Sequence, residues 1–346
     1  MKYKRLGSTG LVVSRVSLGM MSYGSPGWQA WVLPKQEARR FVQQALDAGV
    51  NTFDTADFYS IGESENALGD AIHDLGVRHE VVLASKVGLP MSAAPNGGGL
   101  SKKHVLASLD ASLRRLRTDY LDLYQLHRFD PHTPIDETLD ALDIAVRAGK
   151  VLYAGASNFS TAQIAPAVFA NRWRPAPPLA SMQVQYNLLY REEERDMLPL
   201  CRDNGIGVIV YSPLARGWLT RNPRQVASMT EREALRAKSD RKAEQLYGSI
   251  ENAAVLAAVH AIAQERGVTP ARIALAWLHA QPAVSTVLCG ALEPQHLTEA
   301  LAAVDLELSA DECRRLEEPY VPQAVKDDAF AAVKASAGND DSHSSK

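Results

Sequence analysis

Short apolar runs alternate with amphipathic stretches along most of this sequence. Apolar runs of this length, bounded by glycine, proline and polar residues, are typical of buried strands. We expect strands at residues 16–19, 52–55, 81–87, 121–126, 152–156, 180–184, 208–211 and 286–288. Between them, apolar residues recur at helical spacing. This predicts helices at residues 35–48, 63–73, 102–115, 135–148, 192–203 and 253–266.

The alternation of strands and helices favours an α/β fold with parallel strands. Eight strand–helix units are what a closed (β/α)8 TIM barrel requires. A doubly wound sheet is the alternative, and it would carry a glycine-rich turn after its first strand. Here Gly19 is followed by Met20 and Met21, with no GxGxxG pattern. We therefore expect one barrel domain over residues 1–330.

Three further segments do not fit the repeat. Residues 2–14 alternate around a Ser8-Thr9-Gly10 turn, which predicts an N-terminal β-hairpin that closes the bottom of the barrel. Residues 215–250 are polar, rich in arginine and too long for an ordinary connection, so we expect them to be either functional or disordered. Beyond the last strand we expect extra C-terminal helices, and then a disordered tail of small polar residues at 331–346.

Composition argues against several classes of function. With 346 residues, 46% of them apolar, and a net charge of −3, the chain can bury a large core and has no basic block for nucleic acid or a membrane surface. No apolar run reaches the roughly 18 residues of a membrane span. The three cysteines are far apart and lack metal-ligand spacing, so we interpret them as free thiols in a reducing compartment. Residues 1–10 carry no signal-peptide pattern, and we expect a cytoplasmic protein.

Ionisable side chains follow three successive expected strands. The second strand leads into Asp54 and then Tyr59, the third ends in Lys86, and the fourth is followed by His127. Taken singly, these residues are more simply explained as a turn cap, a half-buried aromatic, a surface charge and a structural histidine. In a parallel barrel, however, the carboxyl ends of the strands meet at the face that holds the active site. Their clustering at neighbouring strand ends therefore favours one shared catalytic site.

These side chains suit the protonation of a carbonyl oxygen. A tyrosine with its ordinary pKa of about 10 is a poor proton donor at neutral pH, and a neighbouring Lys86 ammonium would lower that pKa. Asp54 would hold Lys86 by an ion pair, and His127 would donate a hydrogen bond to the oxygen that gains charge. The hydride must come from a cofactor, because side chains cannot supply one.

Several longer segments resemble the aldo-keto reductases. They are FDTADFYSIGESENALG, VVLASKVG, LDLYQLHRFDP, VLYAGASNFS, SMQVQYNLLYREEERDMLPLCRDNGIGVIVYSPLARGWLT and TVLCGALEPQHLTEAL. The similarity covers roughly residues 1–320, and the long middle segment is most similar to a bacterial YajO-like and aryl-alcohol dehydrogenase-related group. The resemblance implies a barrel that reduces aldehydes and ketones to alcohols. It makes Asp54, Tyr59, Lys86 and His127 the catalytic tetrad, with Tyr59 as the general acid.

The resemblance also implies a site for NADPH, with NADH as a usable substitute. In it, Ser157, Asn158 and Gln183 would hold the nicotinamide carboxamide, Tyr211 would stack on the ring, and the 215–250 segment would fold as a flap over the cofactor. The positions that match cofactor contacts are Gly19, Met20, Met21, Asp54, Ser157, Asn158, Gln183, Tyr211, Ser212, Pro213, Leu214, Arg216, Gly217, Gly290, Ala291, Gln295, His296, Glu299 and Ala300. Of these, Ser212 to Gly217 would follow the pyrophosphate, and Gly290 to Ala300 the adenosine end. The same positions also have plain structural explanations, as turns and core residues.

Cofactor choice and substrate are less constrained by the sequence. Relatives often place a basic or hydroxyl residue near Leu292, whereas Leu292 itself cannot bind a 2′-phosphate and Glu293 would repel one. We therefore expect NADPH to be preferred by a modest margin, with positive charge supplied by His296 or by arginines of the 215–250 segment. Aromatic and flexible side chains suggest a small carbonyl substrate such as an aromatic aldehyde. These are Tyr23, Trp28, Trp31, Phe58, Met20 and Met21, and all six also suit a packing role.

Two rival functions remain open from the sequence. A barrel of this kind can serve as a regulatory subunit that binds the cofactor and senses redox state, and an intact tetrad does not exclude that role. An ene-reductase is the second rival, and it goes with loss of the histidine that His127 represents here. No oligomeric state is predicted.

Overall fold

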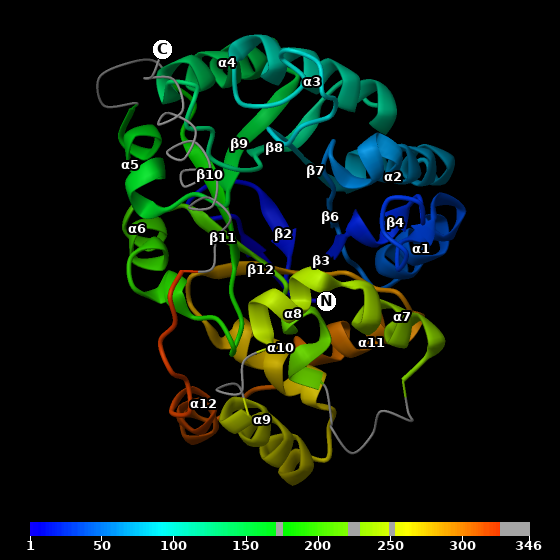
Figure 1. Ribbon diagram of the computed structural model, residues 1–346, viewed down its shortest axis with the longest axis vertical. Coiled ribbons are helices and arrows are strands. Elements are labelled where there is room, and N and C mark those ends of the chain that lie inside the picture. The colour runs from blue at the N-terminus through cyan, green and yellow to red at the C-terminus, as the bar shows by residue number, and fades with distance from the viewer. Residues whose placement is uncertain (171–175, 221–228, 249–252, 326–346) are drawn as a thin grey trace, which may run out of the picture.

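The computed structural model describes residues 1–170, 176–220, 229–248 and 253–325. Eight parallel strands close into a barrel in the order β10-β11-β12-β3-β6-β7-β8-β9 (Figure 1). They are β3 Val16–Gly19, β6 Thr52–Asp54, β7 Val82–Val87, β8 Leu121–Leu126, β9 Val151–Ser157, β10 Leu179–Gln185, β11 Gly207–Tyr211 and β12 Val284–Cys289. All eight lie where the pattern placed them, with ends that differ by at most two residues. The predicted (β/α)8 barrel is therefore confirmed.

The barrel strands are buried on both faces, which explains why they read as continuous apolar runs. Every residue of β7 and β8 is buried. One cluster, which includes Val82, Leu123 and Ile209, fills the space between the strands and the N-terminal hairpin. A larger cluster packs the other strand faces against the helices.

Helices surround the barrel (Figure 1). They are α1 Ala38–Asp47, α2 Glu63–Leu75, α3 Lys102–Leu116, α4 Ile135–Arg147, α5 Thr161–Phe169, α6 Met197–Asp203, α9 Ala253–Arg266, α10 Pro270–Ala280 and α11 Pro294–Ala303, followed by the extra helix α12 Ala310–Glu317. Two expected helices begin later than the pattern indicated, because 3-10 turns at Lys35–Glu37 and Glu192–Glu194 precede α1 and α6. None of the helices in the described ranges combines the length and the apolar character needed to cross a membrane.

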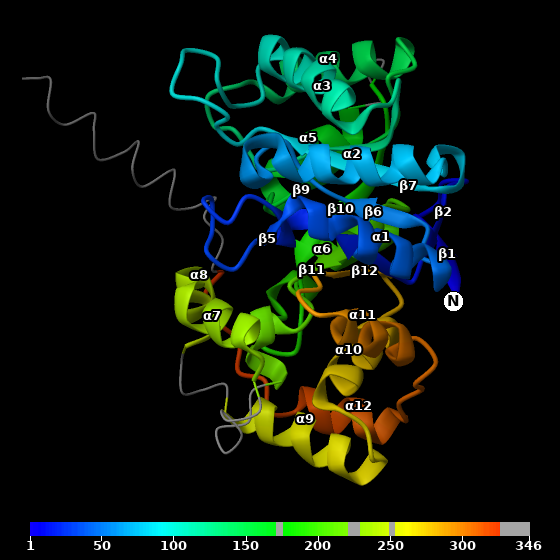
Figure 2. The same cartoon turned by 90° about the vertical axis from the view of Figure 1, so that its right-hand side faces the viewer.

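The predicted N-terminal hairpin is present and pairs β1 Tyr3–Arg5 with β2 Val12–Ser14 in antiparallel fashion. Leu6 follows β1 and is fully buried in the cluster that fills the barrel. Its neighbour Gly7 approaches the start of β11 so closely that a Cβ on Gly7 would lie 2.5 Å from the backbone nitrogen of Gly207. Figure 2 shows this hairpin at one end of the barrel and α7 and α8 at the other.

The polar segment 215–250 is mostly helical where the structure describes it. It contains a 3-10 turn at Ala215–Thr220 and the helices α7 Glu231–Ser239 and α8 Arg241–Tyr247. A capping box starts α7, with the Thr230 side chain accepting from the Glu233 N–H and the Glu233 side chain accepting from the Thr230 N–H. The predicted tail at 331–346 lies outside the described residues.

Candidate active site

Backbone strain gathers at the mouth of the barrel, where the strands end. Among the described residues, most of the non-glycine residues with positive φ follow β6, β9 or β11. They are Ser60, Ile61, Asn158, Ser212, Ala215 and Arg216. Such conformations cost about 1–3 kcal/mol each and cluster at ligand clamps and active sites. The strain therefore marks the same mouth that the ionisable residues indicated from the sequence.

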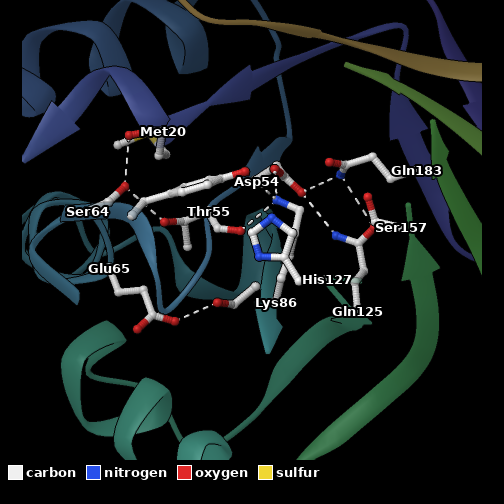
Figure 3. Close-up of polar contacts among 12 residues, drawn as sticks. Met20, Asp54, Thr55, Ser64, Glu65, Lys86, Gln125, His127, Ser157 and Gln183 are labelled. Carbon is white, nitrogen blue, oxygen red and sulfur yellow. Dashed lines mark hydrogen bonds and ion pairs between the residues drawn. The ribbon is translucent and has the colours of Figure 1, made fainter. Parts of the chain in front are cut away.

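Lys86 lies at the centre of a buried polar network at this mouth (Figure 3). It is the next-to-last residue of β7, and its side chain is completely buried. Its Nζ donates to Asp54 Oδ1 at 2.5 Å, to the Thr55 carbonyl at 2.8 Å and to Tyr59 Oη at 3.4 Å. These contacts use all three hydrogens of the ammonium. The structure thus brings Asp54, Tyr59 and Lys86 together as predicted.

The second oxygen of Asp54 is held by two glutamines from neighbouring strands. Gln125 on β8 and Gln183 on β10 donate to Asp54 Oδ2 at 3.0 and 2.9 Å. Gln183 was expected to contact the cofactor, and in this structure its amide nitrogen is bound to Asp54. Sequence reasoning missed Gln125, although a buried glutamine inside an apolar strand is itself a signal of a polar partner.

Burial and neighbouring charges act in opposite directions on the pKa values of Lys86 and Tyr59. Burial acts to lower the pKa of the Lys86 ammonium, but Asp54 and Tyr59 outweigh it and raise the pKa above its ordinary value. Burial raises the pKa of the Tyr59 phenol, and the neighbouring Lys86 offsets this only in part. The ammonium lowers the pKa of Tyr59 as the sequence indicated, but the loss of solvent outweighs it, so the net pKa is raised and not lowered. Tyr59 carries its proton at neutral pH.

His127 follows β8 and stands edge-on to Tyr59, with ring centroids 5.6 Å apart and planes at 84°. Burial, together with the nearby charges of Lys86 and Arg128, holds the pKa of His127 well below its ordinary value. The imidazole is therefore neutral. Its Nδ1 is buried and has no hydrogen-bond partner among the described residues. The fourth expected residue thus joins the other three, as a neutral ring beside the phenol.

Asp57 is a buried carboxyl that sequence reasoning did not single out. It lies between Asp54 and Tyr59 along the chain and is completely buried. Both side-chain oxygens have no hydrogen-bond partner among the described residues. Burial, followed by the charge of Glu65, raises the pKa of Asp57 to about 8. The sequence could have indicated Asp57 by its position, because it is an acidic residue inside the segment that joins Asp54 to Tyr59.

Residues after β9 and β11 form a second polar group beside the first. Asn158 Nδ2 donates to the His127 carbonyl at 2.9 Å, and Tyr211 Oη donates to Asn158 Oδ1 at 2.7 Å. Ser157 Oγ accepts a further hydrogen bond from Asn158 at 3.0 Å. Ser157, Asn158 and Tyr211, which the resemblance places around the nicotinamide ring, are thus adjacent in the structure.

The turn after β11 offers donors for an anion. Ser212, Ala215 and Arg216 adopt left-handed backbone conformations there, and a Cβ on Gly217 would meet nothing within 4 Å. Arg216 Nη1 donates to Asp240 Oδ2 at 2.7 Å, while its buried Nε has no partner among the described residues. Together with Pro213 and Leu214, these are the residues expected beside a pyrophosphate. An unpaired guanidinium N–H in an open, strained turn fits a phosphate group.

The residues expected at the adenosine end lie just after β12 and on α11. Gly290 follows β12, and Ala291 and Ala300 are buried in the core. Gln295 and Arg272 hold Glu299 through hydrogen bonds of 3.0 and 2.8 Å, and His296 is half-buried and contacts Glu233 of α7.

Three other expected cofactor contacts lie at the first barrel strand. Gly19 ends β3, Met20 is buried in the core, and Met21 is partly buried against it.

One of the aromatic residues expected at the substrate site, Trp28, lies against Tyr59, and a second, Phe58, packs on Trp28. The Trp28 ring is 6.3 Å from the Tyr59 ring and 5.9 Å from the Phe58 ring. The other two have different partners. Tyr23 is completely buried and donates to the Ala291 carbonyl, and Trp31 is buried beneath the Arg236 guanidinium. Trp28 and Phe58 are thus the aromatic residues near the phenol.

Comparison with known proteins agrees with this geometry. A family model described as the aldo/keto reductase family matches residues 15–320. Versiconal hemiacetal acetate reductase of Aspergillus parasiticus is 37% identical over 94% of this chain and 98% of its own length. A putative aryl-alcohol dehydrogenase of Schizosaccharomyces pombe is 37% identical over 94% of this chain and 97% of its own length. Aldo-keto reductase AMT2 of Alternaria alternata is 38% identical over 93% of this chain and 92% of its own length. These relatives are fungal, so they support the aryl-alcohol dehydrogenase resemblance and not the bacterial YajO-like placement.

Proposed function

The chain belongs to the aldo/keto reductase family, and from that premise we propose that it reduces aldehydes and ketones to alcohols with a nicotinamide cofactor. The observation that carries the proposal is the buried Lys86 ammonium, shared between Asp54 and Tyr59 at the barrel mouth. A buried charge is costly, and a chain retains one where its chemistry needs it. In this proposal Tyr59 supplies the proton.

The hydrogen bonds of Lys86 set the direction of proton transfer. Because Lys86 donates to Tyr59 Oη, the phenol oxygen is an acceptor on that side and its own hydrogen is directed elsewhere. That hydrogen is available to a carbonyl oxygen bound at the mouth. As the proton leaves, the ammonium stabilises the phenolate that forms. Asp54, with its second oxygen held by Gln125 and Gln183, fixes Lys86 in this position.

His127 orients the carbonyl group. The neutral imidazole carries one N–H, which can donate to the substrate oxygen without competing for the proton that Tyr59 transfers. Its position edge-on to the phenol would direct both donors at one oxygen. This arrangement favours reduction of a carbonyl over reduction of an alkene.

The cofactor supplies the hydride when it is bound. Ser157 and Asn158 offer amide and hydroxyl partners for its carboxamide, Tyr211 offers an aromatic face, and Arg216 offers a free N–H for its pyrophosphate. We place its adenosine end at the segment from Gly290 to Ala300. NADPH is preferred by a modest margin in this proposal, and NADH is usable.

The substrate is a small carbonyl compound, and an aromatic aldehyde fits best. Trp28 and Phe58 form an edge-to-face pair, and Trp28 also lies against the ring of Tyr59. Aromatic side chains of this kind pack favourably on a substrate ring. The aryl-alcohol dehydrogenase name of one relative agrees with that choice. The three free cysteines agree with a cytoplasmic location.

The test is oxidation of NADPH and NADH by the purified protein with a panel of aldehydes that includes 4-nitrobenzaldehyde. We expect turnover with aromatic aldehydes and the corresponding alcohol as product. Tyr59→Phe is the control for the site. Cofactor binding without turnover on any aldehyde would instead indicate a regulatory cofactor-binding barrel.

A further inference from the structure

A strap of residues 229–248, which carries α7 and α8, lies along one side of the barrel mouth (Figures 1 and 2). At one end, Tyr247 Oη contacts Gln185 Nε2 at 2.6 Å, where β10 ends. In the middle, Asp240 accepts from Arg216 of the turn after β11. At the other end, α7 contacts the segment between β12 and α11. The strap therefore spans the strand ends where we place the cofactor.

The contact between α7 and α11 is a carboxylate paired with a histidine. Glu233 Oε1 lies 2.9 Å from His296 Nε2, and Glu233 Oε2 accepts from the Thr230 N–H at 2.8 Å. Burial opposes ionisation of Glu233, but the Thr230 N–H and His296 outweigh it and lower the pKa of the carboxyl. Glu233 is thus a fixed negative charge in the first turn of α7.

The hydrogen bonds of His296 determine its tautomer. The Leu292 backbone N–H donates to Nδ1 at 3.2 Å, so Nδ1 carries no hydrogen. The ring hydrogen is then on Nε2 and points at Glu233. A second proton on Nδ1 would set two donors against each other at Leu292. In this arrangement the Nε2–H of His296 is already bound to Glu233, so the ring offers no free donor to an anion.

Carboxylates and guanidinium groups both surround this point. Arg232 Nη1 donates to the Leu292 carbonyl at 3.3 Å and lies 3.9 Å from Glu293, while its Nη2 lies 4.0 Å from Glu37. Glu37 is itself paired with Arg40 at 2.6 Å. Two guanidinium groups therefore face three carboxylates, and Glu233 is the carboxylate with no arginine partner among these contacts. A dianionic phosphate that approaches Leu292 meets the charge of Glu233.

We propose that Glu233 is a specificity residue that discriminates against the 2′-phosphate of NADPH and so keeps the preference over NADH small. The inference rests on the proposed function, because it assumes that the adenosine end binds beside Leu292 and His296. Glu233 acts in two ways. Its charge repels the phosphate, and its hydrogen bond occupies the Nε2–H that would otherwise serve as a phosphate donor. Neither effect acts on NADH, whose ribose carries a neutral hydroxyl at that position.

The test is equilibrium binding measured by quenching of tryptophan fluorescence. The ligands are NADPH and NADH, together with 2′,5′-ADP and 5′-AMP, which differ from each other by the 2′-phosphate alone. Glu233→Gln removes the charge and retains an acceptor for the Thr230 cap. Glu231→Gln removes an exposed charge two residues earlier on the same helix and is the matched control.

We expect Glu233→Gln to bind NADPH and 2′,5′-ADP about tenfold more tightly, and NADH and 5′-AMP within about twofold of wild type. The gain should shrink at high salt. Glu231→Gln should leave all four affinities within about twofold. Equal changes for the phosphorylated and unphosphorylated ligands, or no change in either, would show that Glu233 only holds the strap and would overturn the proposal. If wild type bound neither cofactor, the proposed function would fail as well, whereas unaltered discrimination with both cofactors binding would leave that function intact.

Discussion

Replacing Asp57 with asparagine should remove a loss of stability that the wild-type protein undergoes as pH rises. Asp57 is completely buried and neither carboxyl oxygen has a partner among the described residues. Burial raises its pKa from 3.8 to about 8 in the folded state. Between these values the folded protein retains a proton that the unfolded chain has lost. The stabilisation by the neutral carboxyl is therefore complete below pH 3.8 and is lost as pH rises toward about 8.

The magnitude follows from the width of that window. Each unit of pKa difference corresponds to about 1.36 kcal/mol, so a shift of roughly four units costs about 5–6 kcal/mol in all. Between pH 5 and pH 8 the folded protein loses about 4 kcal/mol of this stabilisation. Asparagine has the same shape and does not ionise. Its free energy of unfolding should therefore rise relative to wild type by about that amount over the same interval.

Urea unfolding at several pH values measures this difference directly, because all other titrating groups are common to both proteins. Asp70→Asn, which removes an exposed carboxylate from α2, is the matched control and should show no such pH dependence. A constant free-energy difference between Asp57→Asn and wild type from pH 5 to pH 8 would refute the reasoning. It would mean that Asp57 is ionised in the folded protein.

Four further predictions concern the reaction. Tyr59→Phe removes the proton donor and keeps the ring, so the reduction rate should fall by at least about a hundredfold while cofactor affinity stays within about twofold. Lys86→Met leaves burial unopposed at Tyr59, so its pKa should rise further and turnover at neutral pH should fall about a hundredfold or more, measured as kcat against pH, with circular dichroism to check folding. With an enone substrate, the orientation given by His127 should yield the unsaturated alcohol, and product analysis that finds mainly saturated ketone would count against that role. Trp28→Ala should raise KM about five- to tenfold for an aromatic aldehyde and much less for a small aliphatic one.

The strands could be predicted because their burial is visible in the local sequence as runs of apolar residues. A strand covered on both faces carries apolar residues on both faces, as at most positions of β7 and β8. The helix α7 of the strap carries no such pattern. Residues of α7 are not fully buried, so its sequence is polar, and a polar stretch reads as a loop. What makes α7 a helix is its capping box and its contacts with α11, and the second of these cannot be read locally.

The candidate catalytic residues could be singled out individually, but their partners could not. Position at a strand end identified Lys86 and His127, because a barrel places all strand ends at one mouth. The hydrogen bond from Gln183 to Asp54 joins residues 129 positions apart, and no local pattern specifies such a pair. Local sequence alone could not place Tyr23 either, which we had expected at the substrate site. An aromatic residue near a strand end suits a pocket and a core equally, and its buried hydroxyl group instead donates to Ala291.

The corrected pKa of Tyr59 changes how the site is understood. A phenol whose pKa fell below neutral pH would lose its proton before a carbonyl compound bound. Burial instead keeps the Tyr59 phenol protonated, and the Lys86 ammonium lies 3.4 Å from its oxygen. In the proposed reaction the Lys86 charge would be in place before Tyr59 gives up its proton, and its stabilising effect would be greatest once the proton has moved. The burial that costs stability at Lys86 would therefore stabilise the transition state more than the resting state.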